Sequence, residues 1–162
     1  GMPTGGVNEK NLLDYIKFNK IVACGGTWMV KKDLIEAENW DEIERLTRQA
    51  VQTMLGLRVD HIGINTENEQ EAQAAAKLFV DMFGMKEKVG NSSIFVGENE
   101  IEIMNKMYLG KNGHIAIATH TLPRAIAYFR ARGYEFREET VTDKAAYFKD
   151  EIAGFAIHLV QR

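Results

Sequence analysis

The stretches that decide the fold of this chain are Asp60-His61-Ile62-Gly63-Ile64-Asn65-Thr66 and Gly113-His114-Ile115-Ala116-Ile117-Ala118-Thr119. Side chains alternate between the two faces of a strand, so each stretch predicts a strand with its histidine on one face and its isoleucines on the other. Each is followed by a helical pattern and later by a second strand of the same form, Ile101-Glu102-Ile103-Met104 and Ile157-His158-Leu159-Val160. The chain therefore contains an internal repeat.

Each copy of the repeat predicts one helix after its first strand, so that both copies read βαβββ. In the first copy, Asn68 and Glu71 form a capping pattern and Gly84 ends the helix. In the second copy, Thr121 is the expected N-cap and Gly133 the expected end. The expected strands are residues 59–66, 86–89, 93–97 and 100–105 in the first copy, and residues 113–119, 135–139, 145–149 and 155–160 in the second. The predicted fold class is α+β.

Four positions of the repeat carry candidate chemistry, because each strand presents one imidazole or carboxylate among apolar neighbours: His61, Glu102, His114 and His158. One such group per strand is a way to build a metal site in a pseudo-symmetric fold. Nitrogen and oxygen ligands favour a divalent transition metal, Zn²⁺, Ni²⁺, Co²⁺ or Fe²⁺, over Ca²⁺ or Mg²⁺. The alternatives are a closed tetrahedral structural site and four polar residues on a solvated sheet face. Asn65 is expected to share the face of His61 and to line the cavity.

The tandem βαβββ order with these four residues resembles the vicinal oxygen chelate superfamily, which includes glyoxalase I, methylmalonyl-CoA epimerase, extradiol dioxygenases and bleomycin-resistance proteins. The resemblance covers residues 58–162 and implies a cupped mixed sheet in which each module supplies metal ligands from its first and last strands. It assigns His61, Glu102 and His114 to the first three ligand positions. His158 falls at the fourth position, where glyoxalase I carries a glutamate that also handles the substrate proton. Glu102 and His158 are therefore the candidate catalytic residues.

Residues 1–57 follow a different, α/β pattern and are predicted to be a separate region. Two glycine-rich loops, Pro3-Thr4-Gly5-Gly6-Val7-Asn8 and Gly25-Gly26-Thr27-Trp28-Met29-Val30, flank an expected helix at residues 8–17 and a strand at residues 21–24. A second helix is expected after the capping pair Asn39 and Glu42. The two loops resemble the last two βα units of the 2-keto-3-deoxy-6-phosphogluconate/4-hydroxy-2-oxoglutarate aldolases, which are TIM barrels. Some members of that family carry an extension like residues 58–162.

The aldolase resemblance carries two expectations about chemistry. Backbone N–H groups in the loops are expected to bind substrate phosphate or carboxylate, at Thr4, Gly5, Gly6, Gly25 and Gly26. Ordinary turn chemistry is the alternative for these glycines. The Schiff-base lysine of the family lies on a strand that would precede residue 1, so class I aldolase activity is not expected in this fragment.

Composition limits the classes of partner. About 45% hydrophobic and 27% charged residues are typical of a globular protein, and a formal charge of −3 without a Lys/Arg cluster argues against nucleic acid and membrane surfaces. No apolar run approaches about 18 residues, so a cytoplasmic location is expected. Cys24, in an apolar strand, is interpreted as a buried thiol. The orphan strand at residues 20–24 needs a hydrogen-bonding partner, so it is expected to pair with another copy or to fold over the sheet, and a homodimer is predicted.

Two hypotheses about function follow from these patterns. The first is a metal-dependent lyase or isomerase acting on a small 2-oxo or 2-hydroxy acid, because Lewis-acid chelation of two neighbouring oxygens would stabilise an enediolate-like intermediate. The alternative is a non-catalytic regulatory or assembly domain of an aldolase whose C-terminal part is this chain.

Overall fold

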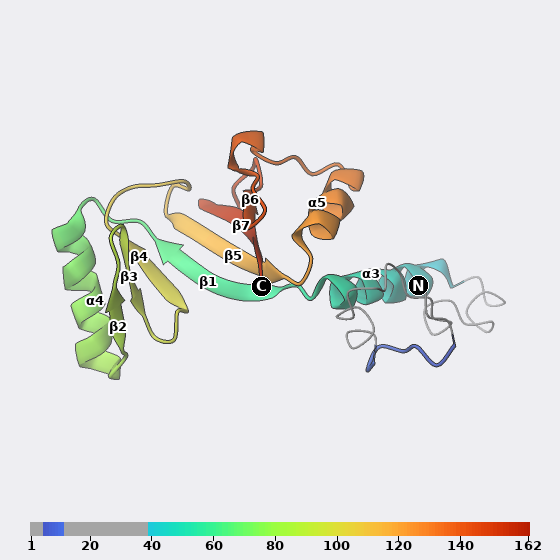
Figure 1. Cartoon of the computed structure of the whole chain (residues 1–162), viewed down its shortest axis with the longest axis horizontal. Helices are drawn as coiled ribbons and strands as arrows, with labels where there is room; N and C mark the ends of the chain where they lie inside the picture. Colours follow the sequence, from blue (N-terminus) through green and yellow to red (C-terminus); the bar gives the residue numbers. More distant parts are fainter. Residues whose placement is uncertain (1–4, 12–38) are drawn as a thin grey trace. The chain divides into compact units, whose positions relative to one another are not determined.

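The computed structural model describes residues 5–11 and 39–162 (Figure 1). The chain divides into two compact units, residues 1–57 and residues 58–162. The expected strand at residues 21–24, the pair Gly25-Gly26 and Thr4 lie outside the described residues. Within the described ranges, no helix combines the length and the apolar character needed to span a bilayer.

The described residues of the first unit include a turn near Asn8 and a long helix. The side-chain oxygen of Asn8 accepts the N–H groups of Lys10 and Asn11, at 2.9 and 3.1 Å. The expected helix at residues 8–17 is described only as far as residue 11. Helix α3 (Trp40–Leu55) begins after Asn39, whose side chain accepts the N–H of Glu42 at 3.2 Å, so the predicted capping pair is confirmed.

The second unit is a mixed sheet of seven strands with two α-helices. Its elements in chain order are β1 (Arg58–Ile64), α4 (Glu69–Phe83), β2 (Glu87–Val89), β3 (Ser93–Val96), β4 (Ile101–Met104), β5 (Gly113–Thr119), α5 (Leu122–Ala131), the 3-10 helix η2 (Glu138–Thr140), β6 (Ala145–Tyr147) and β7 (Phe155–Gln161). The strand order is β2-β3-β4-β1-β5-β7-β6. Strands β1 and β5, the first strands of the two copies, therefore lie side by side in the middle of the sheet (Figure 1).

Strand directions repeat in the two halves of this sheet. Strand β1 is parallel to β4, β5 is parallel to β7, and β1 and β5 are antiparallel to each other. Each half thus pairs its first strand with its last, and the two halves meet through their first strands. This arrangement confirms the predicted α+β fold of tandem modules in a mixed sheet.

Both helices cover the same face of the sheet. Ala72 and Ala76 of α4 are fully buried against a cluster of strand residues, Ile94, Val96 and Ile103. Phe129 of α5 borders a hollow together with Ile117 and Leu159. Because side chains alternate along a strand, the neighbours of these apolar residues point to the other face, which is where the four candidate ligands lie.

The structure differs from the predicted strand at residues 135–139. Phe136 forms only an isolated bridge with Phe148, and the chain then turns into η2. The cause is the hydroxyl of Thr140, which donates to the Arg137 carbonyl at 2.6 Å and accepts the N–H of Tyr147 at 3.0 Å. A side chain thereby takes a hydrogen bond that a strand backbone would have made, and the ladder stops.

The N-terminus of α5 also differs from its prediction. Thr121 precedes the helix in an extended conformation, but its side chain makes no capping hydrogen bond. The side chain of Gln161, at the end of β7, instead accepts the N–H of Leu122 at 2.7 Å. In the first module the predicted cap is confirmed, since the side chain of Asn68 accepts the N–H of Glu71 at 2.8 Å.

Candidate metal centre

Three imidazoles converge on the face of the sheet opposite the helices. His61, His114 and His158 come from β1, β5 and β7, and each is buried. Each ring offers a nitrogen atom, and these three atoms lie within 4.8 Å of one another. The Nε2 atoms of His61 and His114 are 3.2 Å apart.

Glu102 brings a carboxylate from β4 to the same place. Its Oε1 atom lies 3.1 Å from Nε2 of His114 and 3.6 Å from Nε2 of His61. The hydroxyl of Ser93, on the neighbouring strand β3, donates to its Oε2 atom at 2.6 Å. Burial raises the pKa of Glu102, but the hydrogen bonds with His114 and Ser93 outweigh burial and leave that pKa below its usual value. Glu102 is therefore an ionised neighbour of two imidazoles at neutral pH.

The register of the sheet explains why these groups meet. His61 lies across from Ala116, and His158 lies beside Ala116 on the other side. In the other half of the sheet, His114 lies across from Gly63, and Glu102 lies beside Gly63. The two modules therefore place their ligands at equivalent positions around a central residue, as an internal repeat requires.

A β-bulge in β1 adds a carboxylate that strand alternation would send to the other face. The pairing with β5 passes from Val59↔Ile117 directly to His61↔Ala116, so Asp60 is the extra residue. Its Oδ2 atom lies 2.7 Å from Nδ1 of His61. Arg162 donates to both oxygens of Asp60, from Nε at 2.8 Å and from Nη2 at 2.9 Å. These hydrogen bonds, that of Arg162 foremost, hold the pKa of Asp60 well below its usual range.

His158 is the least satisfied of the three imidazoles. Both of its ring nitrogens are buried without a hydrogen-bond partner among the described residues. Its ring stacks on that of Tyr147, with centroids 4.4 Å apart and planes 11° apart. Burial, reinforced by the nearby His114 and His61, lowers the pKa of His158 to about 4. The imidazole is therefore neutral at pH 7 and retains a lone pair.

Aromatic rings flank the cluster at equivalent positions of the two modules. Phe95 lies beside Glu102 in the β3–β4 register, and its ring meets that of His61 edge-on at 5.9 Å. Tyr147 lies beside His158 in the β6–β7 register. Burial, with smaller contributions from Tyr108 and Glu102, raises the pKa of Tyr147 to about 12, so its phenol stays protonated.

These residues fit a divalent transition metal. Ligand atoms that share one ion at about 2.1 Å, at angles of about 90–110°, lie about 3.0–3.4 Å apart. The distances of 3.1 and 3.2 Å fall in that range, and the distance of 3.6 Å lies just outside it. Buried polar atoms are normally satisfied, and coordination to an ion would give one of the two unpartnered ring nitrogens of His158 a partner. Whether an ion binds stays a prediction.

Of the other predicted site residues, the structure describes Asn65, Gly5 and Gly6. The side chain of Asn65 donates to the backbone carbonyls of Tyr108 and Gly110, at 3.3 and 2.9 Å, and so holds the segment between the modules. Gly5 and Gly6 are exposed and have positive φ angles of 77° and 69°. These angles agree with the turn interpretation of the first glycine loop.

Sequence reasoning missed Asp60, Arg162, Ser93, Phe95 and Tyr147. Strand alternation contained a signal for two of them, because Ser93 and Phe95 share one face of an expected strand. For Asp60, strand alternation predicted the face opposite to His61. The bulge that brings the two together is a property of the pairing between β1 and β5.

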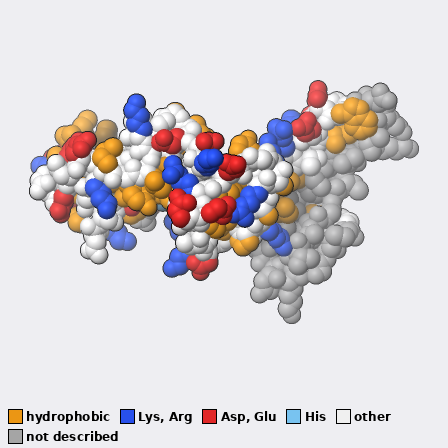
Figure 2. Space-filling view, turned by 90° about the horizontal axis from the view of Figure 1, so that it is seen from above, with side chains coloured by type: hydrophobic (Ala, Val, Ile, Leu, Met, Phe, Trp, Pro, Cys, Tyr) orange, Lys and Arg blue, Asp and Glu red, His pale blue; other side chains and the backbone are white. Residues whose placement is uncertain are grey.

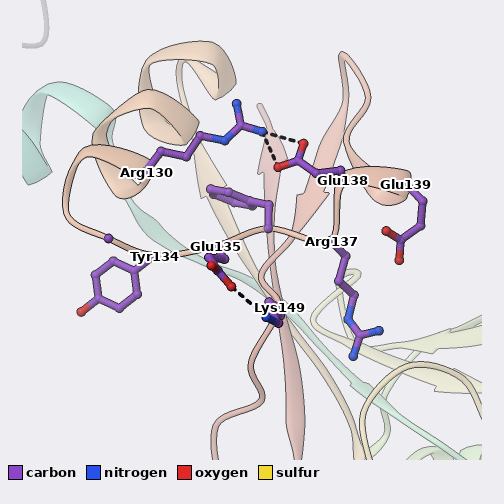
Figure 3. Close-up of a pocket in the computed structure, with 9 residues that line it drawn as sticks. Arg130, Tyr134, Glu135, Arg137, Glu138, Glu139 and Lys149 are labelled. Carbon is purple, nitrogen blue, oxygen red and sulfur yellow. Dashed lines mark hydrogen bonds and ion pairs between the residues drawn. The ribbon is translucent and has the colours of Figure 1, made fainter.

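A hollow beside η2 is lined by charged and aromatic side chains and contains no histidine. In the hollow shown in Figure 3, Arg130 pairs with Glu138 and Lys149 pairs with Glu135, so the charges within each pair cancel. On the face seen in Figure 2, acidic and basic side chains are interspersed, as the small net charge suggests.

Comparison with known proteins relates the first unit to aldolases. The family model for KDPG and KHG aldolase matches residues 1–46. The 2-dehydro-3-deoxy-phosphogluconate aldolase of Haemophilus influenzae is 54% identical over 50 residues, which are 31% of this chain and 24% of that protein. The KHG/KDPG aldolase of Escherichia coli is 40% identical over 50 residues, with the same coverage of 31% and 24%. The chain thus spans about a quarter of these relatives, and the match confirms the aldolase resemblance of its N-terminal part.

Several solved structures resemble this chain at low sequence identity. A hypothetical protein from Bacillus halodurans C-125 has a TM-score of 0.49 at 16% identity, covering 65% of this chain and 94% of that one. Methylmalonyl-CoA epimerase from Mycobacterium tuberculosis has a TM-score of 0.47 at 18% identity, covering 64% and 86%. A glyoxalase/bleomycin resistance protein/dioxygenase superfamily member from Vibrio splendidus 12B01 has a TM-score of 0.36 at 15% identity, covering 65% and 99%.

Proposed function

We propose that residues 58–162 hold a divalent transition metal ion and catalyse a lyase- or isomerase-type reaction of a small 2-oxo or 2-hydroxy acid. The ligands would be His61, Glu102, His114 and His158. The observation that carries the proposal is the convergence of three buried imidazoles, of which His158 has no hydrogen-bond partner for either ring nitrogen within residues 5–11 and 39–162. Burying such a group unsatisfied costs free energy, and coordination of one ring nitrogen to an ion would remove part of that cost.

The chain's own groups would divide the chemistry between them. A bound ion would supply Lewis-acid polarisation of two neighbouring substrate oxygens. Glu102 is ionised, so its carboxylate can accept a proton from the substrate carbon next to a polarised carbonyl. His158 is neutral at pH 7 and can likewise bind an ion or accept a proton at a ring nitrogen. Phe95 and Tyr147 supply apolar walls that limit the access of water.

Metal content tests the first half of this proposal. The full chain, produced in metal-supplemented medium and purified extensively, is expected to retain close to one equivalent of a transition metal. His61→Ala and His158→Ala should lose most of it, whereas His120→Gln, which changes the histidine outside the cluster, should retain it. A wild-type protein without metal above background would contradict the proposal.

Exchange of substrate protons tests the second half. The metal-loaded protein is expected to promote deuterium uptake from D₂O at the carbon next to the carbonyl of a 2-oxo acid, followed by NMR. Glu102→Gln should slow the exchange by about 100-fold or more, the range for loss of a general base. The metal content of that variant must be measured alongside, because Glu102 is also a candidate ligand. If the metal-loaded protein does not react with any of a panel of 2-oxo and 2-hydroxy acids, the proposed catalytic activity is contradicted and only metal or ligand binding is left as its function.

A second function is supported by the match of residues 1–46 to the aldolase family model. We propose as the alternative that residues 58–162 regulate or assemble an aldolase to which the first unit contributes. Deleting residues 58–162 from an intact aldolase of this architecture should then change its kinetics or its oligomeric state. Identical behaviour of the truncated and intact enzymes would contradict this alternative.

The expected homodimer is tested by sedimentation of the chain.

A further inference from the structure

Asp60 and Arg162 form a polar network behind His61 that the proposed ligand set does not include. The two nitrogens of the His61 ring face different groups. Nδ1 lies 2.7 Å from Oδ2 of Asp60, whereas Nε2 lies 3.2 Å from Nε2 of His114. The bulge at Asp60 is what brings its carboxylate to the side of its own neighbour in the chain.

The carboxylate decides which nitrogen of His61 carries the proton. An ionised carboxylate only accepts hydrogen bonds, so Nδ1 of His61 must be the donor. In the neutral ring the lone pair then resides on Nε2, the atom nearest the cluster. Arg162 keeps the carboxylate in place through two hydrogen bonds, of 2.8 and 2.9 Å. The backbone N–H of Arg162 donates to the carbonyl of Thr119 at 3.0 Å, which ties this arginine to the end of β5.

The second module has no counterpart of this network. Gly113 precedes His114 as Asp60 precedes His61. Its φ angle is 150°, and a side chain there would overlap the backbone carbonyl of Gly63. In agreement, Nδ1 of His114 is buried without a partner among the described residues. The repeat therefore does not by itself generate the network, and Asp60 is specific to the first module.

We infer that Asp60, held by Arg162, is a positioning residue that fixes the Nδ1–H tautomer of His61 and presents its Nε2 atom for coordination. The inference rests on the proposed function in one respect, namely that Nε2 of His61 is a ligand atom. It extends the site from four side chains to six. It also assigns a role to Arg162, which lies far from His61 in the sequence.

Histidine tautomers and metal affinity together test this inference. In the metal-free wild-type chain, ¹H–¹⁵N NMR is expected to show the proton of His61 on Nδ1. In Asp60→Asn the amide can turn its NH₂ group toward Nδ1, which moves the proton to Nε2, as in serine proteases whose triad aspartate is replaced. Affinity for Co²⁺, followed by calorimetry and visible absorption, should fall about 10- to 100-fold. The affinity of Arg162→Met for Co²⁺ should also fall. Arg162→Lys should recover part of that lost affinity.

Arg130→Met is the matched control, because Arg130 also binds one carboxylate twice, that of Glu138 at 2.8 and 2.7 Å, but away from the cluster. It should bind Co²⁺ as the wild type does. Should Asp60→Asn fail to fold, Arg162→Met carries the same test, since it leaves the bulge residue in place. Wild-type tautomer and affinity in both variants would overturn the inference and leave the metal site standing. A tautomer shift without any metal binding by the wild type would overturn the proposed function and support the tautomer assignment.

Discussion

Gly63 lies directly across the sheet from His114, and the imidazole of His114 occupies the space that any side chain at residue 63 would need. At the equivalent position of the other module, Ala116 lies across from His61 and carries a methyl group. One glycine therefore lets an imidazole fold back over its partner strand, toward Glu102 and His61.

Gly63→Ala is expected to abolish tight metal binding without removing a ligand. Its Cβ atom would overlap the ring of His114 and displace Nε2 from the cluster. We expect affinity for Co²⁺ to fall by about 100-fold, the upper end of the range for supporting residues. Ala116→Gly is the control: it should lower stability by about 0.5–1 kcal/mol and leave affinity unchanged. Equal affinities of wild type and Gly63→Ala would show that His114 is not a ligand.

Ser93→Ala should weaken the site through Glu102. The hydroxyl of Ser93 is a hydrogen-bond donor to Oε2, which leaves Oε1 directed at the two imidazoles. Without it, the carboxylate can rotate, and metal affinity should fall about tenfold. Isothermal titration of the variant against the wild type measures the change. Ser92→Ala, one residue earlier, is the control and should behave as the wild type.

The metal-free protein should lose stability as the pH falls from about 6.5 to about 4. The pKa of His158 is lowered by burial to about 4 in the folded state, against 6.5 for the ordinary group. Between these values the unfolded chain binds a proton at this residue and the folded chain does not, so acid favours unfolding. The loss should reach about 3 kcal/mol below pH 4.

Urea unfolding in the presence of a chelator measures this effect. In His158→Gln the part of the pH dependence that this imidazole causes should disappear, whereas His120→Gln should keep it. An unchanged slope in His158→Gln would mean that His158 is solvated in solution.

Saturation with metal should raise the stability of the chain. Free ion at one hundred times Kd adds about 2.7 kcal/mol if the unfolded chain does not bind it. For a unit of this size, that corresponds to a rise in Tm of about 10 °C or more. Thermal unfolding with and without Co²⁺ or Zn²⁺ checks this, and His114→Ala should remove most of the rise. A rise that persists in that variant would place the ion elsewhere.

Patterns within short stretches of sequence were sufficient to predict most of the helices and strands of the second unit. The expected strand at residues 113–119 has its predicted bounds, and the expected helix after Asn68 begins with its predicted cap. These features depend on residues close in sequence, namely on alternation and on a side chain that binds a nearby N–H group. The prediction of a strand at residues 135–139 was wrong because it depends on residues that are not adjacent in sequence. Thr140 accepts the N–H of Tyr147 only when the two segments meet in the folded chain.

The sequence by itself determined that His61, Glu102, His114 and His158 would occupy equivalent strand positions, because alternation with a period of two is fixed by the backbone. Only the tertiary structure decided that Asp60 would join them. A bulge arises from the register of two strands, and Arg162 reaches Asp60 across 102 residues of chain. Such register is set by hydrogen bonds between distant segments, and no periodicity within either segment specifies it.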